Sequence, residues 1–220
     1  MPLESLAIAA PVIFLAYAVF GMTGFGAAMV AVPLLVQFLP LQFAVPLVVL
    51  FDLVCTALVG GRNWRQVSRG ELKRLFPWML LGIGLGVTLL HNAGAKWPLM
   101  LLGTFVLAVC IKGLRRAPAT TTAPLSGHWA FPFGVFGGIF SALFGTGGPI
   151  YTIYLSRRLD ALDQFRATIS VVILLSGVIR AVAFGSAGLY SQPEILSVAA
   201  VLLPVSLLGL FAGSRLRTRV

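Results

Sequence analysis

Two ionisable residues stand inside long apolar runs of the sequence, and glycine-rich segments interrupt two other runs. Asp52 lies near the middle of the apolar run 42–60, and Arg180 lies close to the end of the run 163–184. The interruptions are the segments 21–26 and 145–149, which read GMTGFG and GTGGP. Charged groups are rare and costly inside a bilayer, where they mark pathways for substrates, ions or protons. Glycine and proline end helices, so these segments predict breaks.

Helices that begin at the two breaks could bind an anion. Such a helix start presents backbone N–H groups without helical partners and the positive end of the helix dipole. We expect starts near Gly26 and near Gly148–Pro149, with hydroxyl donors from nearby threonines and a guanidinium group whose planar fork matches sulfonate or carboxylate oxygens. The predicted substrate-binding residues are Thr23, Gly24, Phe25, Gly26, Gly145, Thr146, Gly147, Gly148, Pro149 and Arg180.

Three charged residues admit more than one role. Asp52 is predicted to couple proton movement to transport, or alternatively to be a structural partner of Arg180 or a protonated, hydrogen-bonded acid. Arg180 clamps the anion, or extends its head group outward to water. Arg166 opens its run on the basic side of the protein, where it gates or admits the substrate, or anchors the chain.

The composition limits the class of protein. Of the 220 residues, 59% are hydrophobic and 10% are charged, whereas a soluble domain has about 25% charged residues. A soluble fold and a disordered chain are therefore excluded. The two histidines are far apart in the sequence, and no nucleophile–base pair or metal-ligand cluster is apparent. We expect no enzyme activity, no metal and no cofactor.

The basic residues predict the topology. Apolar runs of membrane-spanning character cover 5–39, 42–60, 75–91, 97–113, 129–156, 163–184 and 194–213. All sixteen Lys and Arg residues except Lys96 and Arg180 fall within 62–74, 112–116, 157–166 and 215–219. The positive-inside rule places these regions in the cytoplasm, so the net charge of +10 is not a nucleic-acid signature. We expect a bacterial-type inner membrane protein with its N-terminus outside and its C-terminus in the cytoplasm.

The same topology makes the run 129–156 a hairpin, because both of its flanks are cytoplasmic and it is too short for two spans. For the run 5–39, two full spans remain an alternative to a hairpin.

The two halves of the chain form an internal repeat. The break at 24–28 aligns with that at 145–149, and Glu71-Leu72 aligns with Glu194-Ile195. The loop 62–74 is strongly basic, but its counterpart 185–193 has no Lys or Arg, which indicates that the repeats are inverted. The predicted fold is an all-α integral membrane protein with glycine-broken hairpins meeting near the midplane. It is one membrane domain, with repeat one at 1–116, a cytoplasmic linker at 117–128 and repeat two at 129–220.

Pairs of glycines four residues apart predict close helix packing. They are Gly82 and Gly86, Gly134 and Gly138, and Gly209 and Gly213.

The motifs resemble those of the sulfite exporter TauE/SafE family of membrane transporters. In the first half they are Thr23 to Ala28 with Pro33-Leu34, and in the second half Phe144 to Pro149 with Phe165 to Thr168 and Arg180. The resemblance implies transport of a small sulfur oxyanion or organosulfonate and leaves the direction open. Protons and sodium both remain candidates for the coupling ion. By comparison with longer members a final helix is expected to be missing, so the chain is either a naturally short member or completes itself as a homodimer. A passive anion channel and a carrier of small carboxylates remain alternatives.

Overall fold

The computed structural model describes residues 3–23, 26–60, 66–92, 96–114 and 125–217. These residues form helices and no strand. In chain order they are α1 (Leu3–Thr23), α2 (Ala27–Leu35), α3 (Leu41–Gly60), α4 (Arg69–Asn92), α5 (Lys96–Leu114), the short 3₁₀ helix η2 (Gly127–Trp129), α6 (Ala130–Phe144), α7 (Gly147–Ser156), α8 (Leu162–Ser186) and α9 (Pro193–Arg217). Within the described residues, six helical stretches are long and apolar enough to cross a membrane. The predicted all-α membrane fold is confirmed.

Both long apolar runs are hairpins of a longer and a shorter helix. The run 5–39 contains most of α1, which has 21 residues and begins at Leu3, and the 9 residues of α2, so it does not hold two full spans. The run 129–156 contains α6, with 15 residues, and α7, with 10. The chain turns at Gly26 and at Gly145, whose φ angles are +95° and +72°. Only glycine adopts this left-handed conformation readily, which explains why the helices break there.

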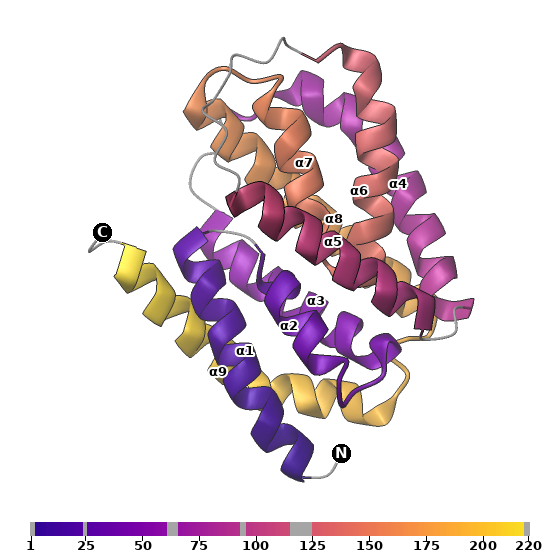
Figure 1. Ribbon diagram of the computed structural model, residues 1–220, viewed down its shortest axis with the longest axis vertical. Coiled ribbons are helices and arrows are strands. Elements are labelled where there is room, and N and C mark those ends of the chain that lie inside the picture. The colour runs from indigo at the N-terminus through magenta and orange to yellow at the C-terminus, as the bar shows by residue number, and fades with distance from the viewer. Residues whose placement is uncertain (1–2, 24–25, 61–65, 93–95, 115–124, 218–220) are drawn as a thin grey trace.

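The two hairpins enter the molecule from opposite ends, and their tips meet near its centre (Figure 1). The helix α4 packs along α6, and α1 packs along α9. The helix α3 packs beside α8 in the middle of the bundle. If α1, α2, α3 and α4 change places with α6, α7, α8 and α9 in that order, the same three pairs of neighbouring helices result. A two-fold repeat requires this symmetry. The repeat boundaries and their inverted orientation stay predictions.

Glycines allow the two long helix pairs to approach closely. A Cβ on Gly82 would overlap the backbone of Val135 on α6, and one on Gly213 would overlap the backbone of Ala18 on α1. A Cβ on Gly138 would lie 2.6 Å from the carbonyl oxygen of Met79. The other three glycines of the predicted pairs make equally close contacts with the facing helix. The prediction of close packing is confirmed.

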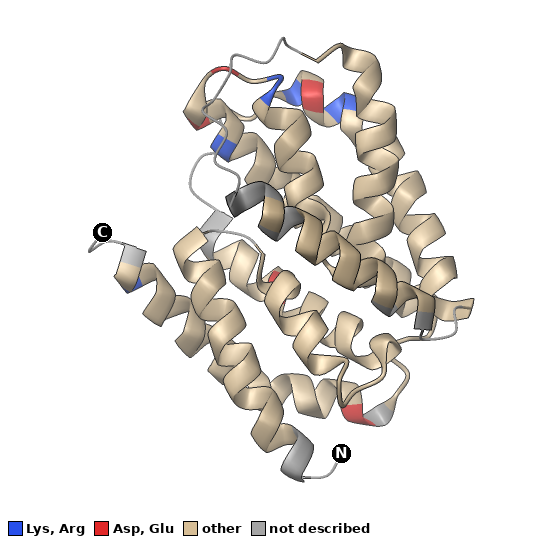
Figure 2. Ribbon diagram, in the orientation of Figure 1, with Lys and Arg blue, Asp and Glu red and all other residues tan. Residues whose placement is uncertain are grey.

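The basic residues that the structure describes gather mainly at one end of the bundle, where α4, α6 and α8 begin (Figure 2). The interpretation of 62–74 as a loop is wrong in its second half, because α4 already begins at Arg69. Hydropathy marks where the apolar part of a span starts, whereas the helix extends further into the polar interface. Arg62 and Arg65 and most of the predicted linker 117–128 lie outside the described residues.

Candidate functional site

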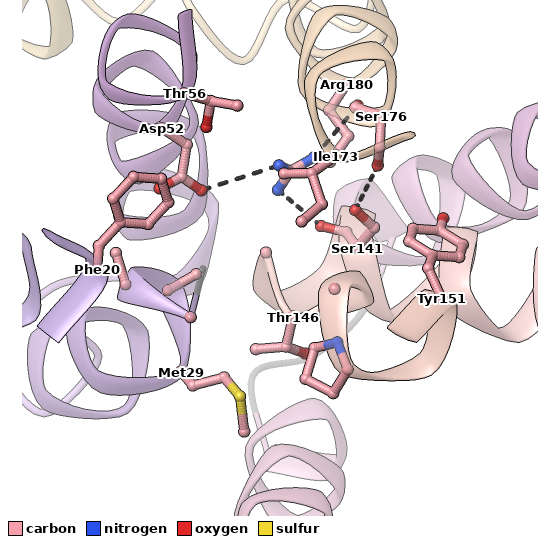
Figure 3. A pocket seen from close by; sticks show the side chains of 16 residues that line it. Phe20, Met29, Asp52, Thr56, Ser141, Thr146, Tyr151, Ile173, Ser176 and Arg180 are labelled. Atoms are coloured by element: carbon pink, nitrogen blue, oxygen red, sulfur yellow. Dashed lines mark hydrogen bonds and ion pairs between the residues drawn. The ribbon is translucent and has the colours of Figure 1, made fainter. Parts of the chain in front are cut away.

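A small cavity lies between the tips of the two hairpins (Figure 3). The beginning of α2, from Gly26 to Met29, forms one wall. Another wall consists of four residues around the beginning of α7, namely Gly145, Thr146, Gly148 and Pro149. Asp52 on α3 and Arg180 on α8 also line the cavity. The site therefore combines residues that are far apart in the sequence at the point where the two halves of the chain meet.

Glycine at position 145 permits the contact between the hairpin tips. A Cβ on Gly145 would lie 2.6 Å from the Cβ of Ala28 and 3.4 Å from a guanidinium nitrogen of Arg180. The N–H of Gly145 donates to the carbonyl oxygen of Ser141 at 2.8 Å and closes the last turn of α6. A larger side chain at this position would push the tips apart and press on the arginine.

Arg180 points into the protein and does not extend to water. Its side chain is 3% exposed. One Nη lies 3.8 Å from a carboxylate oxygen of Asp52, and the other donates to the carbonyl oxygen of Ser141 at 3.0 Å. Its Nε donates to the carbonyl oxygen of Ser176 at 3.3 Å, one helical turn earlier. The guanidinium group at the cavity therefore makes hydrogen bonds to two backbone carbonyl oxygens and a longer ion pair with the carboxylate of Asp52.

The other carboxylate oxygen of Asp52 accepts a hydrogen bond from a tyrosine. The hydroxyl of Tyr17 on α1 donates to Asp52 at 2.8 Å, and it also lies 3.1 Å from the carbonyl oxygen of Val48. The arrangement matches the predicted pairing with Arg180, and it leaves a role in proton coupling open. Tyr17 was missed by the sequence analysis because nothing in its spacing marks it as a neighbour of Asp52.

The wall formed by α7 contains a hydroxyl group without a bonding partner. Thr146 is 1% exposed, and its Oγ1 has no hydrogen-bond partner among the described residues. A buried polar group in that state costs about 1–3 kcal/mol, so it is a feature that binding of a ligand would relieve. Ser141 and Ser176, which hydrogen-bond to each other at 2.7 Å, line the same cavity. Their signal in the sequence was a small polar residue within an apolar run.

Neither helix start at the cavity is capped by a side chain. The N-cap residues are Gly26 for α2 and Thr146 for α7, and neither makes a side-chain capping hydrogen bond. The first backbone N–H groups of a helix have no partners within the helix, and together with the dipole they attract anions. The predicted helix starts near Gly26 and Gly148–Pro149 are within one or two residues of those observed. Chemically, the cavity is suited to negative charge.

Five predicted site residues lie elsewhere or outside the described residues. Gly147 packs against its own hairpin partner, since a Cβ there would lie 2.7 Å from the carbonyl oxygen of Gly137 on α6. Thr23 is exposed and donates to the carbonyl oxygen of Val19. Arg166 is exposed at the basic end of the bundle and does not line the cavity. Gly24 and Phe25 lie outside the described residues.

Comparison with known proteins identifies the family. The family model described as sulfite exporter TauE/SafE matches residues 9–220. The chain belongs to this family. A relative from Comamonas testosteroni, described as probable inner membrane transporter protein TsaS, is 31% identical over 174 residues, which cover 79% of this chain and 72% of the relative. No solved structure matches the chain. This TauE/SafE-family protein is a multi-pass membrane transporter, and its relative supports a location in the inner membrane.

In this TauE/SafE-family transporter the cavity is small. Its volume is about 30 Å³, which is enough for about two water molecules. An oxyanion of sulfur needs more room than this.

Proposed function

We propose that this transporter carries a small sulfur oxyanion or organosulfonate, which binds between the hairpin tips. The observation that carries the proposal is the buried guanidinium of Arg180 facing two helix starts without side-chain caps. The partnerless hydroxyl of Thr146 adds a donor. Three kinds of donor converging from different directions suit an anion whose oxygens point several ways. We infer the sulfur class of the substrate from the family, which is described as sulfite exporters.

Asp52 occupies the place of the substrate in the closed cavity. Its carboxylate is the negative charge opposite Arg180 at 3.8 Å. When an anionic substrate binds the same guanidinium, two negative charges share a desolvated site, which is unfavourable unless one of them is neutralised. A proton taken up by Asp52 restores the balance, and Tyr17 keeps the acid in place. In this mechanism one proton accompanies each anion, which makes the proton the coupling ion.

The two hairpins provide a route for alternating access. Inverted repeats with broken helices place the substrate at the interface between the repeats, and rocking of one repeat exposes the site to each side in turn. The proposed orientation has the N-terminus outside and the basic end of the bundle in the cytoplasm. Arg166, exposed at that end, attracts the anion toward the cytoplasmic opening.

Transport by reconstituted protein tests the proposal. Proteoliposomes are loaded with sulfite, sulfate, thiosulfate, a short sulfonate or acetate, and flux is followed with and without an imposed pH gradient. We expect saturable flux of the sulfur anions that responds to the pH gradient and is lost in Arg180→Gln. The matched control Arg157→Gln removes an exposed arginine and should keep the flux.

Three outcomes would overturn the proposal. Preference for acetate would contradict the substrate class, and flux that rises linearly with concentration would indicate a channel. Unchanged flux in Arg180→Gln would remove this cavity as the site. A thermal-shift screen against the same anions provides a check that does not depend on transport, because a ligand that binds only the folded state raises its stability.

A further inference from the structure

A second polar site lies at the basic end of the bundle, away from the cavity. It is an open groove of about 850 Å³ between the first turns of α4 and the segment that leads into α6. Its walls include Lys73, Arg74, Trp78, His128 and Arg158. None of these residues lines the cavity between the hairpin tips.

The groove carries excess positive charge. Glu71 is the carboxylate beside it, and its side chain is only 7% exposed. Arg158 donates to Glu71 at 2.6 Å and to the carbonyl oxygen of Leu125 at 2.8 Å, and Arg74 lies 3.1 Å from the same carboxylate. The hydrogen bonds with Glu71 raise the pKa of Arg158, and a guanidinium group keeps its charge in proteins in any case. Together with Lys73, these two arginines place three positive charges at the groove against the single negative charge of Glu71.

The surface next to the groove is apolar and faces outward. Leu81 and Leu85 on α4 are 53% and 49% exposed, and Phe131 on α6 is 52% exposed. The ring of Trp78 packs edge-on against Phe131 at 4.8 Å, between the charged groove and this surface. Trp129 is 48% exposed at the beginning of α6. Tryptophan favours the boundary between head groups and acyl chains, so the groove lies at that boundary.

We propose that the groove binds the phosphate head group of an anionic phospholipid. The phosphate is held by Lys73 and Arg74, and the acyl chains lie along the exposed apolar face of α4 and α6. Basic pockets at the membrane surface recognise anionic head groups in this way. A soluble anion would use the same charges but would gain nothing from the apolar surface below them.

Native mass spectrometry of the full chain in detergent tests this inference. Equal amounts of phosphatidylglycerol and phosphatidylcholine are added, and bound lipid is counted. We expect preferential retention of phosphatidylglycerol. The variant Lys73→Ala/Arg74→Ala should weaken its binding about thirtyfold, since each basic residue near an anionic surface contributes about fivefold. Glu71 keeps Arg158 and Tyr154 as partners in this variant, so the fold should persist.

The matched control is Arg69→Ala/Arg157→Ala, which removes two exposed charges at the same end without touching the groove. Equal losses in the two double variants would show only a general surface charge effect and would overturn the proposal. Inorganic phosphate that binds the protein as tightly as phosphatidylglycerol does would also overturn the proposal. If the double variant does not fold, Lys73→Gln, which changes one exposed side chain, should still lose about fivefold.

Discussion

Replacing Asp52 by asparagine should strengthen binding of the anionic substrate while it abolishes the response to pH. Asparagine has nearly the same shape, and its carbonyl oxygen can still accept the hydrogen bond from Tyr17. The substitution therefore removes the negative charge that competes with the substrate for Arg180. It also removes the group that we propose takes up the proton.

The separation between Arg180 and Asp52 sets the size of the effect. At 3.8 Å, two unit charges attract each other by about 4 kcal/mol at an effective dielectric constant of ~20. Part of this attraction is offset, because forming the ion pair costs desolvation energy. If about a third of the attraction opposes substrate binding, Kd should fall at least about tenfold.

The affinity is measured by calorimetric titration of sulfite into purified protein, and the pH response is measured as flux into proteoliposomes. The control is Asp163→Asn, an exposed carboxylate in the first turn of α8, which should leave both readouts unchanged. Weaker binding by Asp52→Asn would refute the idea that Asp52 holds the place of the substrate. Tighter binding with an intact pH response would refute only its role in coupling.

Three further substitutions test other parts of the structure. Thr146→Val should weaken substrate binding without lowering the melting temperature, because it removes a buried hydroxyl that has no partner among the described residues. Gly82→Ala should destabilise the protein by more than about 2 kcal/mol, because the new Cβ would meet the backbone of α6. By contrast, Gly84→Ala should be neutral or stabilise the protein by up to about 1 kcal/mol, because its Cβ would meet nothing within 4 Å. Tyr154→Phe should cost about 1.5–3 kcal/mol, since its hydroxyl donates to the buried carboxylate of Glu71 at 2.7 Å.

Unfolding in detergent, followed by the loss of helical circular dichroism, measures the stability changes. A lower melting temperature for Thr146→Val would mean that its hydroxyl is satisfied in the folded protein. Equal effects of alanine at positions 82 and 84 would contradict the close crossing of α4 and α6. For the tyrosine, the comparison is Tyr190→Phe, whose hydroxyl makes a bond of 3.4 Å to a neutral carbonyl and should cost less.

Much of the fold could be predicted because its causes are local in the sequence. Apolar runs of span length can be satisfied only as helices in a bilayer, and the glycine segments at 21–26 and 145–149 mark the turns at Gly26 and Gly145. Helix limits at the polar interface were less predictable. The helix α4 begins at Arg69, where the sequence has already become charged.

The residues that line the candidate site were only partly predictable. Thr146 and Gly148 line the cavity as expected, but the neighbouring Gly147 faces the other helix of its hairpin. A helix turns each successive residue by about 100°, so adjacent residues of one motif face different surroundings. Only the packing of the hairpins decides which of them face the cavity.

By itself, the sequence determined the class of protein, the positions of the spans, the two breaks and the presence of charges at membrane depth. Composition and local backbone preferences are sufficient for these. The tertiary structure decided that Arg180 faces Asp52 rather than water, and that Tyr17 and Ser141 complete their surroundings. These residues come from α1, α3, α6 and α8. Their meeting depends on how closely the helices cross, which is a property of facing surfaces that spacing along the chain does not contain.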